Sequence, residues 1–187
     1  MAVIMPRGGN LTVSLATLKI GSTGITSAFG EGLAEAASVY LEQSGHRSPV
    51  NMPLRGDVKA NAVVTWDNAT EQMRRCWNDM QVTVEHGAYG VAALLVPQIS
   101  DMQIVQRSKK GTGFDYWLGS QQDDSPLFQN KARLEVSGIL QGTESTVQAR
   151  LRQKLKQTTP TDGVLPAFVV VVEFGEPQSR IADKCTK

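Results

Sequence analysis

The hydrophobic and polar positions of the N-terminal third predict three strands and one helix. Apolar residues alternate with polar ones near the N-terminus and again in two later runs, as in half-buried strands. Between these strands, apolar residues recur every three or four positions over about 28–43, which predicts a helix capped by Thr26 or Ser27. The predicted strands cover residues 11–15, 50–54 and 62–66.

A long helical pattern follows, with Asp67 or Asn68 as its N-cap and Pro97 as its end. The pattern fits either one long helix or two helices broken near Val82. Residues 87–93 have mostly small side chains, so another element can pack closely against the second part of this helical pattern. The predicted buried stripe comprises Met73, Cys76, Trp77, Met80, Val84, Ala88, Val91, Ala92 and Leu95.

The rest of the chain predicts strand, strand, strand, helix and strand. A basic turn with Gly111 and Gly113, both suited to positive φ, joins the first two of these strands. The last strand is β-branched throughout, which predicts a central position in a sheet. The final dozen residues are expected to form an edge segment or a tail. The predicted ranges are Met102–Gln106, Phe114–Leu118, Ala132–Ile139, 144–157 for the helix, and Phe168–Glu173.

Composition places few limits on function. The 187 residues fit one domain, and the net charge of +1 identifies no class of partner. Two cysteines without a CxxC pair, and only two histidines, argue against a zinc site and suit a reducing cytoplasm. The longest apolar run, Ala167–Val172, is too short to cross a bilayer, so no membrane partner is expected.

Two consecutive predicted strands each carry one acidic residue among apolar neighbours. Asp115 lies within Gly113–Leu118, and Glu135 lies within Lys131–Ser137. A buried strand has little reason to hold a carboxylate unless that group is paired or binds a metal. The two strands therefore predict a shared acidic site.

The order of elements, with acidic residues on the first helix and on the second and third strands, resembles the PD-(D/E)XK nuclease-like superfamily. The resemblance covers residues 68–173 and implies that Asp115, Glu135 and the helical Glu85 bind Mg²⁺ or Mn²⁺. It implies a metal-dependent phosphodiesterase of the endonuclease type, in a restriction or phage-defence system. The fold expected is α/β, a mixed β-sheet flanked by helices, with a restriction-endonuclease-like core in the C-terminal two thirds. Within one domain, residues 1–66 would be an elaboration, 67–175 the core and 176–187 a tail.

One position departs from the superfamily pattern. A lysine is expected two residues after the third-strand acid, where it orients the attacking water and stabilises the anion, but this chain has Ser137. Arg133 or Lys131 is expected to replace it, and Arg133 has the same strand parity as Glu135. The basic turn supplies two further candidates, Lys109 and Lys110.

Each acidic residue also has an ordinary structural interpretation. Asp115 could act as a cap or pair with Lys109 across the turn. Glu135 could pair with Arg133 on one face of the sheet, because residues i and i+2 point the same way. Glu85 could be a solvated helix residue.

Two basic clusters predict contacts to nucleic acid, with DNA favoured over RNA. The alternative is a solvated basic face without a ligand. Beside Asp115, either Tyr116 or Trp117 could stack on a base, although core packing is the commoner use of such side chains. The clusters comprise Arg107, Lys109 and Lys110 in the turn, and Arg150, Arg152, Lys154 and Lys156 on the last helix.

The sequence therefore predicts a metal-dependent nuclease, or a relative that binds nucleic acid without cutting it. The competing hypothesis is a non-catalytic interaction or scaffold subunit that retains a degenerate nuclease fold. Either form allows a protein partner or a homo-oligomer.

Overall fold

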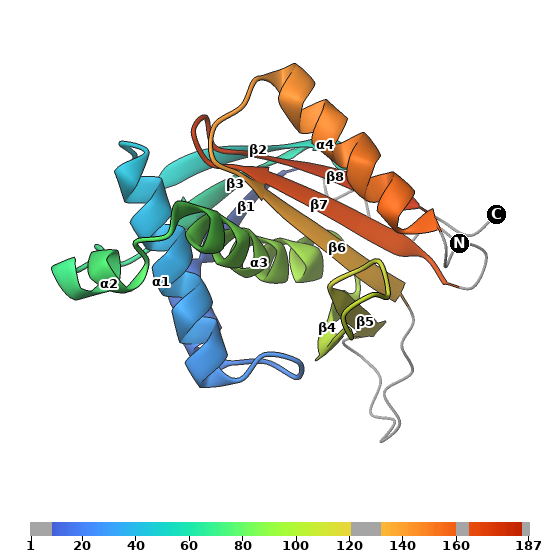
Figure 1. Cartoon of the computed structure of the whole chain (residues 1–187), viewed down its shortest axis with the longest axis horizontal. Helices are drawn as coiled ribbons and strands as arrows, with labels where there is room; N and C mark the ends of the chain where they lie inside the picture. Colours follow the sequence, from blue (N-terminus) through green and yellow to red (C-terminus); the bar gives the residue numbers. More distant parts are fainter. Residues whose placement is uncertain (1–8, 121–131, 160–164, 185–187) are drawn as a thin grey trace.

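The computed structural model describes residues 9–120, 132–159 and 165–184, and a single eight-stranded mixed sheet runs through them. Helices cover both faces of this sheet (Figure 1), which confirms the expected α/β class. The strands are β1 (Asn10–Ser14), β2 (Val50–Gly56), β3 (Ala60–Thr65), β4 (Met102–Arg107), β5 (Tyr116–Ser120), β6 (Ala132–Ile139), β7 (Ala167–Glu173) and β8 (Gln178–Lys184). The helices are η1 (Leu15–Ile20, a 3₁₀ helix), α1 (Ser27–Gln43), α2 (Glu71–Cys76), α3 (Met80–Ile99) and α4 (Glu144–Gln157).

The strand order is β1-β3-β2-β8-β7-β6-β5-β4. The β4, β5 and β6 strands form an antiparallel meander, and α4 then crosses over to place β7 parallel to β6. On the other side, β8 is antiparallel to β7 and parallel to β2, so the N-terminal strands extend the same sheet. Every residue of β7 is buried, as expected for a central strand.

The sheet is covered unequally on its two faces. The helices α1 and α3 lie on one side and α4 lies on the other (Figure 1). The larger apolar core lies beneath α1 and α3 and includes Val136 and Val170. The smaller core lies beneath α4. As predicted, Val147, Leu151 and Leu155 of the helix face the sheet, where they pack against Ile139, Val169, Val171 and Ala182.

Small residues allow α1 to pack closely on α3, as the second part of the helical pattern predicted. A Cβ added at Gly87 would lie 3.1 Å from Ala37 Cα, and one at Gly90 would lie 3.2 Å from Leu33 O. The backbones of the two helices therefore approach where these glycines occur.

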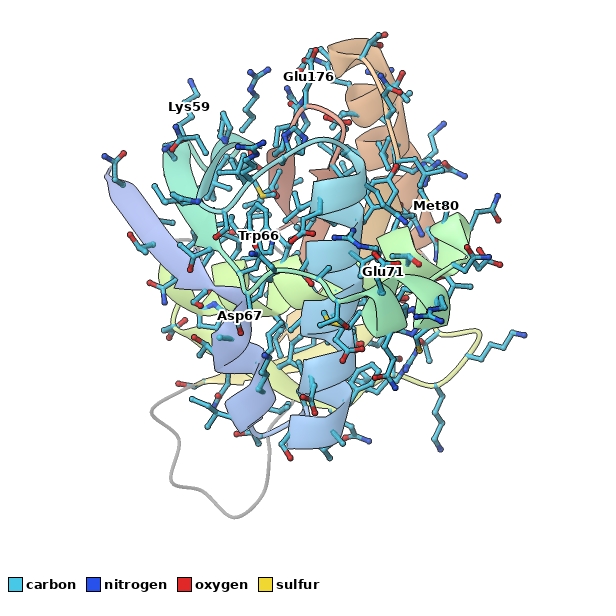
Figure 2. All side chains as sticks on the ribbon, turned by 90° about the vertical axis from the view of Figure 1, so that its left-hand side faces the viewer. Lys59, Trp66, Asp67, Glu71, Met80 and Glu176 are labelled. Atoms are coloured by element: carbon cyan, nitrogen blue, oxygen red, sulfur yellow. The ribbon has the colours of Figure 1, made fainter. Side chains whose placement is uncertain are left out.

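Trp66 fixes the chain after β3 against α1 (Figure 2). Its Nε1 donates to Glu42 Oε1 at 3.2 Å, and the same oxygen accepts from Ala69 N at 2.9 Å. Arg74 of α2 pairs with the other oxygen of Glu42 at 2.6 Å. One carboxylate of α1 thus holds both the residues that follow β3 and the short helix α2.

The long helical pattern is two helices, and the break lies earlier than Val82. Asp79 caps α3 by accepting from Gln81 N at 2.9 Å and Val82 N at 3.2 Å. Thr70, rather than Asp67 or Asn68, caps α2. The first half of the predicted buried stripe is wrong, because α2 buries no residue and both Cys76 and Met80 are exposed.

Three other boundaries also differ from the predictions. Pro97 does not end α3, which continues to Ile99, because a proline in the last turn removes only one backbone donor. The second strand of the meander begins at Tyr116 rather than Phe114, which leaves Asp115 just outside it. Residues 178–184 are not an edge segment or tail, because β8 lies between β7 and β2 inside the sheet.

Candidate functional site

Asp115 and Glu135 lie together at the point where β5 stops pairing with β6. Asp115 N donates to Leu134 O at 2.9 Å, one residue out of the register in which Tyr116 pairs with Leu134. The next donor of β6, Val136 N, bonds to the Asp115 side chain at Oδ2 instead, at 2.8 Å. The carboxylate thus ends the ladder, and the second half of β6 has no β5 residue beside it.

The helix α4 brings a lysine to this pair. Lys154 Nζ lies 2.6 Å from Glu135 Oε1, and the side chains of Lys154 and Glu135 are 20% and 1% exposed. One turn earlier on α4, Arg150 Nη1 donates to Ser137 Oγ at 2.9 Å. The helix α4 therefore contacts Ser137 and Glu135 with two cations that lie four residues apart on one face.

Burial controls the protonation of both carboxyl groups. Loss of solvent, together with the Asp115 charge, raises the pKa of Glu135 to about 7, while Lys154 opposes the rise. Burial also raises the pKa of Asp115, against the hydrogen bond from Val136 N and the Lys154 charge. Glu135 Oε2 is buried and has no hydrogen-bond donor among the described residues.

Tyr89 connects the acidic pair to α3. Its hydroxyl lies 2.7 Å from Glu85 Oε1 and 3.1 Å from Asp115 Oδ1. A phenol has a single hydrogen, so it can donate to only one of these oxygens at a time. Burial and the two carboxylates raise the pKa of Tyr89, which keeps it a neutral donor. Glu85 therefore reaches Asp115 through Tyr89.

Two adjoining hollows open on either side of the carboxylates, and we call them together the cleft. The first, of about 550 Å³, is lined by the start of α3, the second half of β6 and a stripe of α4 that includes Arg150 and Lys154. The second, of about 390 Å³, is lined by the turn between β4 and β5. The residues common to both hollows are Glu85, Tyr89, Asp115, Glu135 and Gln157.

The predicted basic residues divide between the cleft and the outer surface. Arg107, Lys109 and Lys110 line the second hollow, and the turn that carries them has positive φ at Gly111 and Gly113, as expected. Arg150 and Lys154 line the first hollow. Arg152 and Lys156 are exposed and line neither hollow.

Neither residue expected to replace the strand lysine is placed at the acidic pair. Arg133 is 2% exposed and donates to Thr158 O at 2.9 Å and Leu165 O at 2.6 Å, so it joins β6 to the chain after α4. It lines neither hollow. Lys131 lies outside the described residues.

The aromatic residues beside Asp115 belong to packed clusters. Tyr116 is buried with its ring centroid 5.4 Å from that of Tyr89, and burial raises its pKa to about 12. Trp117 packs edge-on against Phe114 at 4.6 Å. Tyr116 and Trp117 line neither hollow, so neither is placed to stack on a base there.

The sequence reasoning missed that Lys154 is the cation of the acidic site. The one sequence feature that could have indicated this role of Lys154 is residue spacing. Val147, Leu151 and Leu155 define the buried face of α4, and Arg150 and Lys154 lie together beside that face. Which side of α4 faces Glu135 depends on the angle at which the helix crosses β6, and the helical pattern of the sequence does not determine that angle.

No protein-family model, curated protein or solved structure matches the chain. Within the described ranges, no three His, Cys, Asp or Glu side chains form a group that could hold a metal ion. Over the same ranges, no helix combines the length and apolar character needed to cross a bilayer. The site itself must therefore support any functional conclusion.

Proposed function

We propose that this protein is a metal-dependent nuclease that hydrolyses phosphodiester bonds of nucleic acid, related to the PD-(D/E)XK nuclease-like superfamily. The observation that carries the proposal is Lys154, whose Nζ lies 2.6 Å from Glu135 in a cleft that also contains Asp115. The site thus combines two carboxylates and one lysine, although the lysine comes from a helix rather than from the strand.

The arrangement of the elements supports the same relationship. The segment from α3 to β7 has the order helix, strand, strand, strand, helix, strand, and its strands are neighbours in the sheet. Glu135 lies within the third strand, where the resemblance expects an acidic residue, and Asp115 directly precedes the second strand instead of lying within it. A restriction-endonuclease-like core remains part of the proposal.

The carboxylates suit a hard divalent cation. Mg²⁺ is commonly held by one or two carboxylates together with water and substrate phosphate, so it needs no group of three protein ligands. Asp115 and Glu135 would hold Mg²⁺ or Mn²⁺, and Glu135 Oε2, which is buried and accepts no hydrogen bond from the described residues, would be the Glu135 ligand atom. When bound, such an ion lowers the pKa of coordinated water and neutralises developing negative charge.

The other residues have roles that follow from their positions. Lys154 carries its charge beside Glu135, where it can orient an attacking water and stabilise a pentavalent phosphorane-like anion. Tyr89 holds Asp115 in place through its hydroxyl, and Glu85 supports Tyr89. In this proposal Glu85 acts through Tyr89, whereas the resemblance implied direct metal binding.

The test is cleavage of single-stranded and duplex DNA and of RNA in the presence of Mg²⁺ or Mn²⁺. Asp115→Asn, Glu135→Gln and Lys154→Met should each reduce the rate by about 100-fold or more, because the first two weaken the metal site and the third removes a cation that stabilises the transition state. Lys156→Met, on the same helix but outside the cleft, is the matched control and should cut at the wild-type rate. Undiminished cleavage by the Asp115 and Glu135 variants would reject the proposed site.

The second candidate is a non-catalytic interaction subunit. It is favoured by one observation: the described residues contain no group of three possible metal ligands, so the Glu135–Lys154 pair could serve packing alone. Thermal unfolding during an Mg²⁺ or Mn²⁺ titration separates the two. A ligand at 100 times its Kd stabilises the native state by about 2.7 kcal/mol, and this gain should vanish in Glu135→Gln. Equal unfolding temperatures with and without either ion, together with no cleavage, would favour the interaction subunit.

A further inference from the structure

The cleft continues on both sides of the acidic pair, and each side has its own arginine. Arg150 lines the first hollow and Arg107 lines the second, while Asp115 and Glu135 line both. Neither arginine forms an ion pair within the described part of the chain. The two guanidinium groups therefore line different parts of one cleft, and neither is taken up by a carboxylate within 4.0 Å among the described residues.

Arg150 is held in position by β6. Its Nη1 donates to Ser137 Oγ at 2.9 Å and approaches Gly138 O at 3.5 Å. These contacts engage one nitrogen of a group with five N–H donors arranged in a fixed plane. The remaining donors suit a phosphate oxygen in the first hollow, because guanidinium groups bind phosphate through paired hydrogen bonds.

Among the described residues, aromatic rings and not hydrogen bonds orient the Arg107 side chain. Its Cζ lies 5.8 Å from the ring centroid of Phe29 and 6.0 Å from those of Tyr89 and Tyr116. Contacts of this kind restrict the guanidinium without using its N–H donors. Lys109 and Lys110 follow in the same turn and add positive charge to the second hollow.

We propose that Arg107 and Arg150 form two phosphate-binding subsites, one on each side of the acidic pair, and that the substrate strand passes through the cleft between them. This inference rests on the proposed nuclease function and adds to it the form of the substrate. The cut phosphodiester bond is an internal one, with a bound phosphate on both sides. A mononucleotide, or a strand that ends at the acidic pair, would engage only one of the two arginines.

Salt dependence of binding tests the subsites without catalysis. The probe is a fluorescein-labelled single strand of fifteen thymidines, and fluorescence anisotropy in EDTA gives Kd at a series of salt concentrations. Each phosphate contact contributes about 0.7 to the slope of log Kd against log salt for single strands. Arg107→Ala and Arg150→Ala should each lower the slope by about 0.7, and the double variant by about 1.4.

Two control variants make this result specific. Arg152→Ala removes a charge from α4 outside the cleft and should keep the wild-type slope. Arg150→Lys retains the charge and should keep the slope even if the weaker geometry raises Kd. Wild-type slopes in both Arg107→Ala and Arg150→Ala would overturn the inference, as would a loss confined to one of them.

Closed circular DNA tests the internal cut. With Mg²⁺, the wild-type protein should linearise closed single-stranded circles or nick closed duplex circles, and should also cut linear strands of the same sequence. Cleavage of linear strands alone would overturn the inference and leave a nuclease that requires ends. No cleavage of any substrate would instead count against the proposed function, and the salt slopes would then decide separately whether a strand spans both arginines.

Discussion

Lys154 and Glu135 form an ion pair in which the carboxylate is almost fully shielded from water. Removing one partner of such a pair leaves the other charge buried without compensation, at a cost of about 3–5 kcal/mol. Lys154→Met should therefore lower the free energy of unfolding by about 3 kcal/mol at pH 8, measured with urea. Lys156→Met is expected to change it by less than about 0.5 kcal/mol.

A double-mutant cycle checks the origin of that loss. Combining Lys154→Met with Glu135→Gln removes the stranded charge, so the double variant should be more stable at pH 8 than Lys154→Met alone. If the double variant instead lost the sum of the two single effects, the pair would contribute nothing beyond its separate side chains.

Glu135 also makes stability depend on pH in a defined direction. Its pKa is about 7 in the native state against an ordinary value of 4.5, so between these values the native state retains a proton that the unfolded chain has lost. The native state is therefore favoured below about pH 4.5 and loses this advantage as the pH rises to about 7. At about 1.4 kcal/mol per tenfold change in proton affinity, the loss is about 3 kcal/mol.

The Glu135→Gln variant isolates this effect, because Gln does not titrate. In metal-free buffer, the difference in unfolding free energy, wild type minus Glu135→Gln, should fall by about 3 kcal/mol between pH 4.5 and pH 7. A difference that stays constant over this range would show that Glu135 titrates normally in the native protein.

At this scale the sequence identified the two acids but not the cation. Asp115 and Glu135 are recognisable because a carboxylate among apolar strand residues requires a partner. Arg133 has the strand parity that was expected, yet its guanidinium bonds to carbonyl oxygens beyond α4. Alternation along a strand predicts only the face of the sheet from which a side chain leaves. Where the end of a long side chain then lies depends on the neighbouring elements.

Among the elements, the closest approach at the site is that of α3 to β6. A Cβ added at Gly138 would lie 2.4 Å from Val84 O, a backbone atom that cannot move without the helix. Gly138→Ala should therefore push α3 from β6 and destabilise the protein by about 1–3 kcal/mol in urea unfolding.

Gly32→Ala provides the matched control within a helix. An added Cβ there would lie 3.6 Å from Trp77 Cζ2, which is ordinary contact, and alanine is the better helix former. This variant should be more stable than wild type by about 0.5–1 kcal/mol. A Gly138→Ala protein as stable as wild type would show that α3 and β6 are less tightly apposed.

Elements with strong patterns were predicted closely and weakly patterned ones were not. The bounds of β6 and α4 coincide with the predictions, because both have long, regular apolar spacing. The β8 strand was missed because its buried positions include Gln178 and Ser179, and its backbone pairs on both sides regardless of side-chain polarity. Burial of polar residues in a central strand is a result of tertiary pairing.

For the whole molecule, residues 9–66 are built into the structure that holds the site. The α1 helix supplies Leu33 and Ala37 against the glycine face of α3, and β2 pairs with β8. A fragment of residues 67–187 would expose both surfaces and should lack a cooperative unfolding transition in urea, followed by circular dichroism. A sigmoidal transition of the fragment would show that the C-terminal segment is an independent domain.

Glu135 of β6 pairs with Lys154 of α4, the helix that links β6 to β7, and the two residues are 19 positions apart in the chain. A search pattern that requires the acid and the lysine on one strand, two residues apart, would not find this chain, because it has Ser137 at the lysine position. A pattern written as an acid on the strand followed by Arg-x-x-x-Lys on the next helix would include it. Under the proposed nuclease function, sequences that lack the strand lysine are the ones to examine with this spacing.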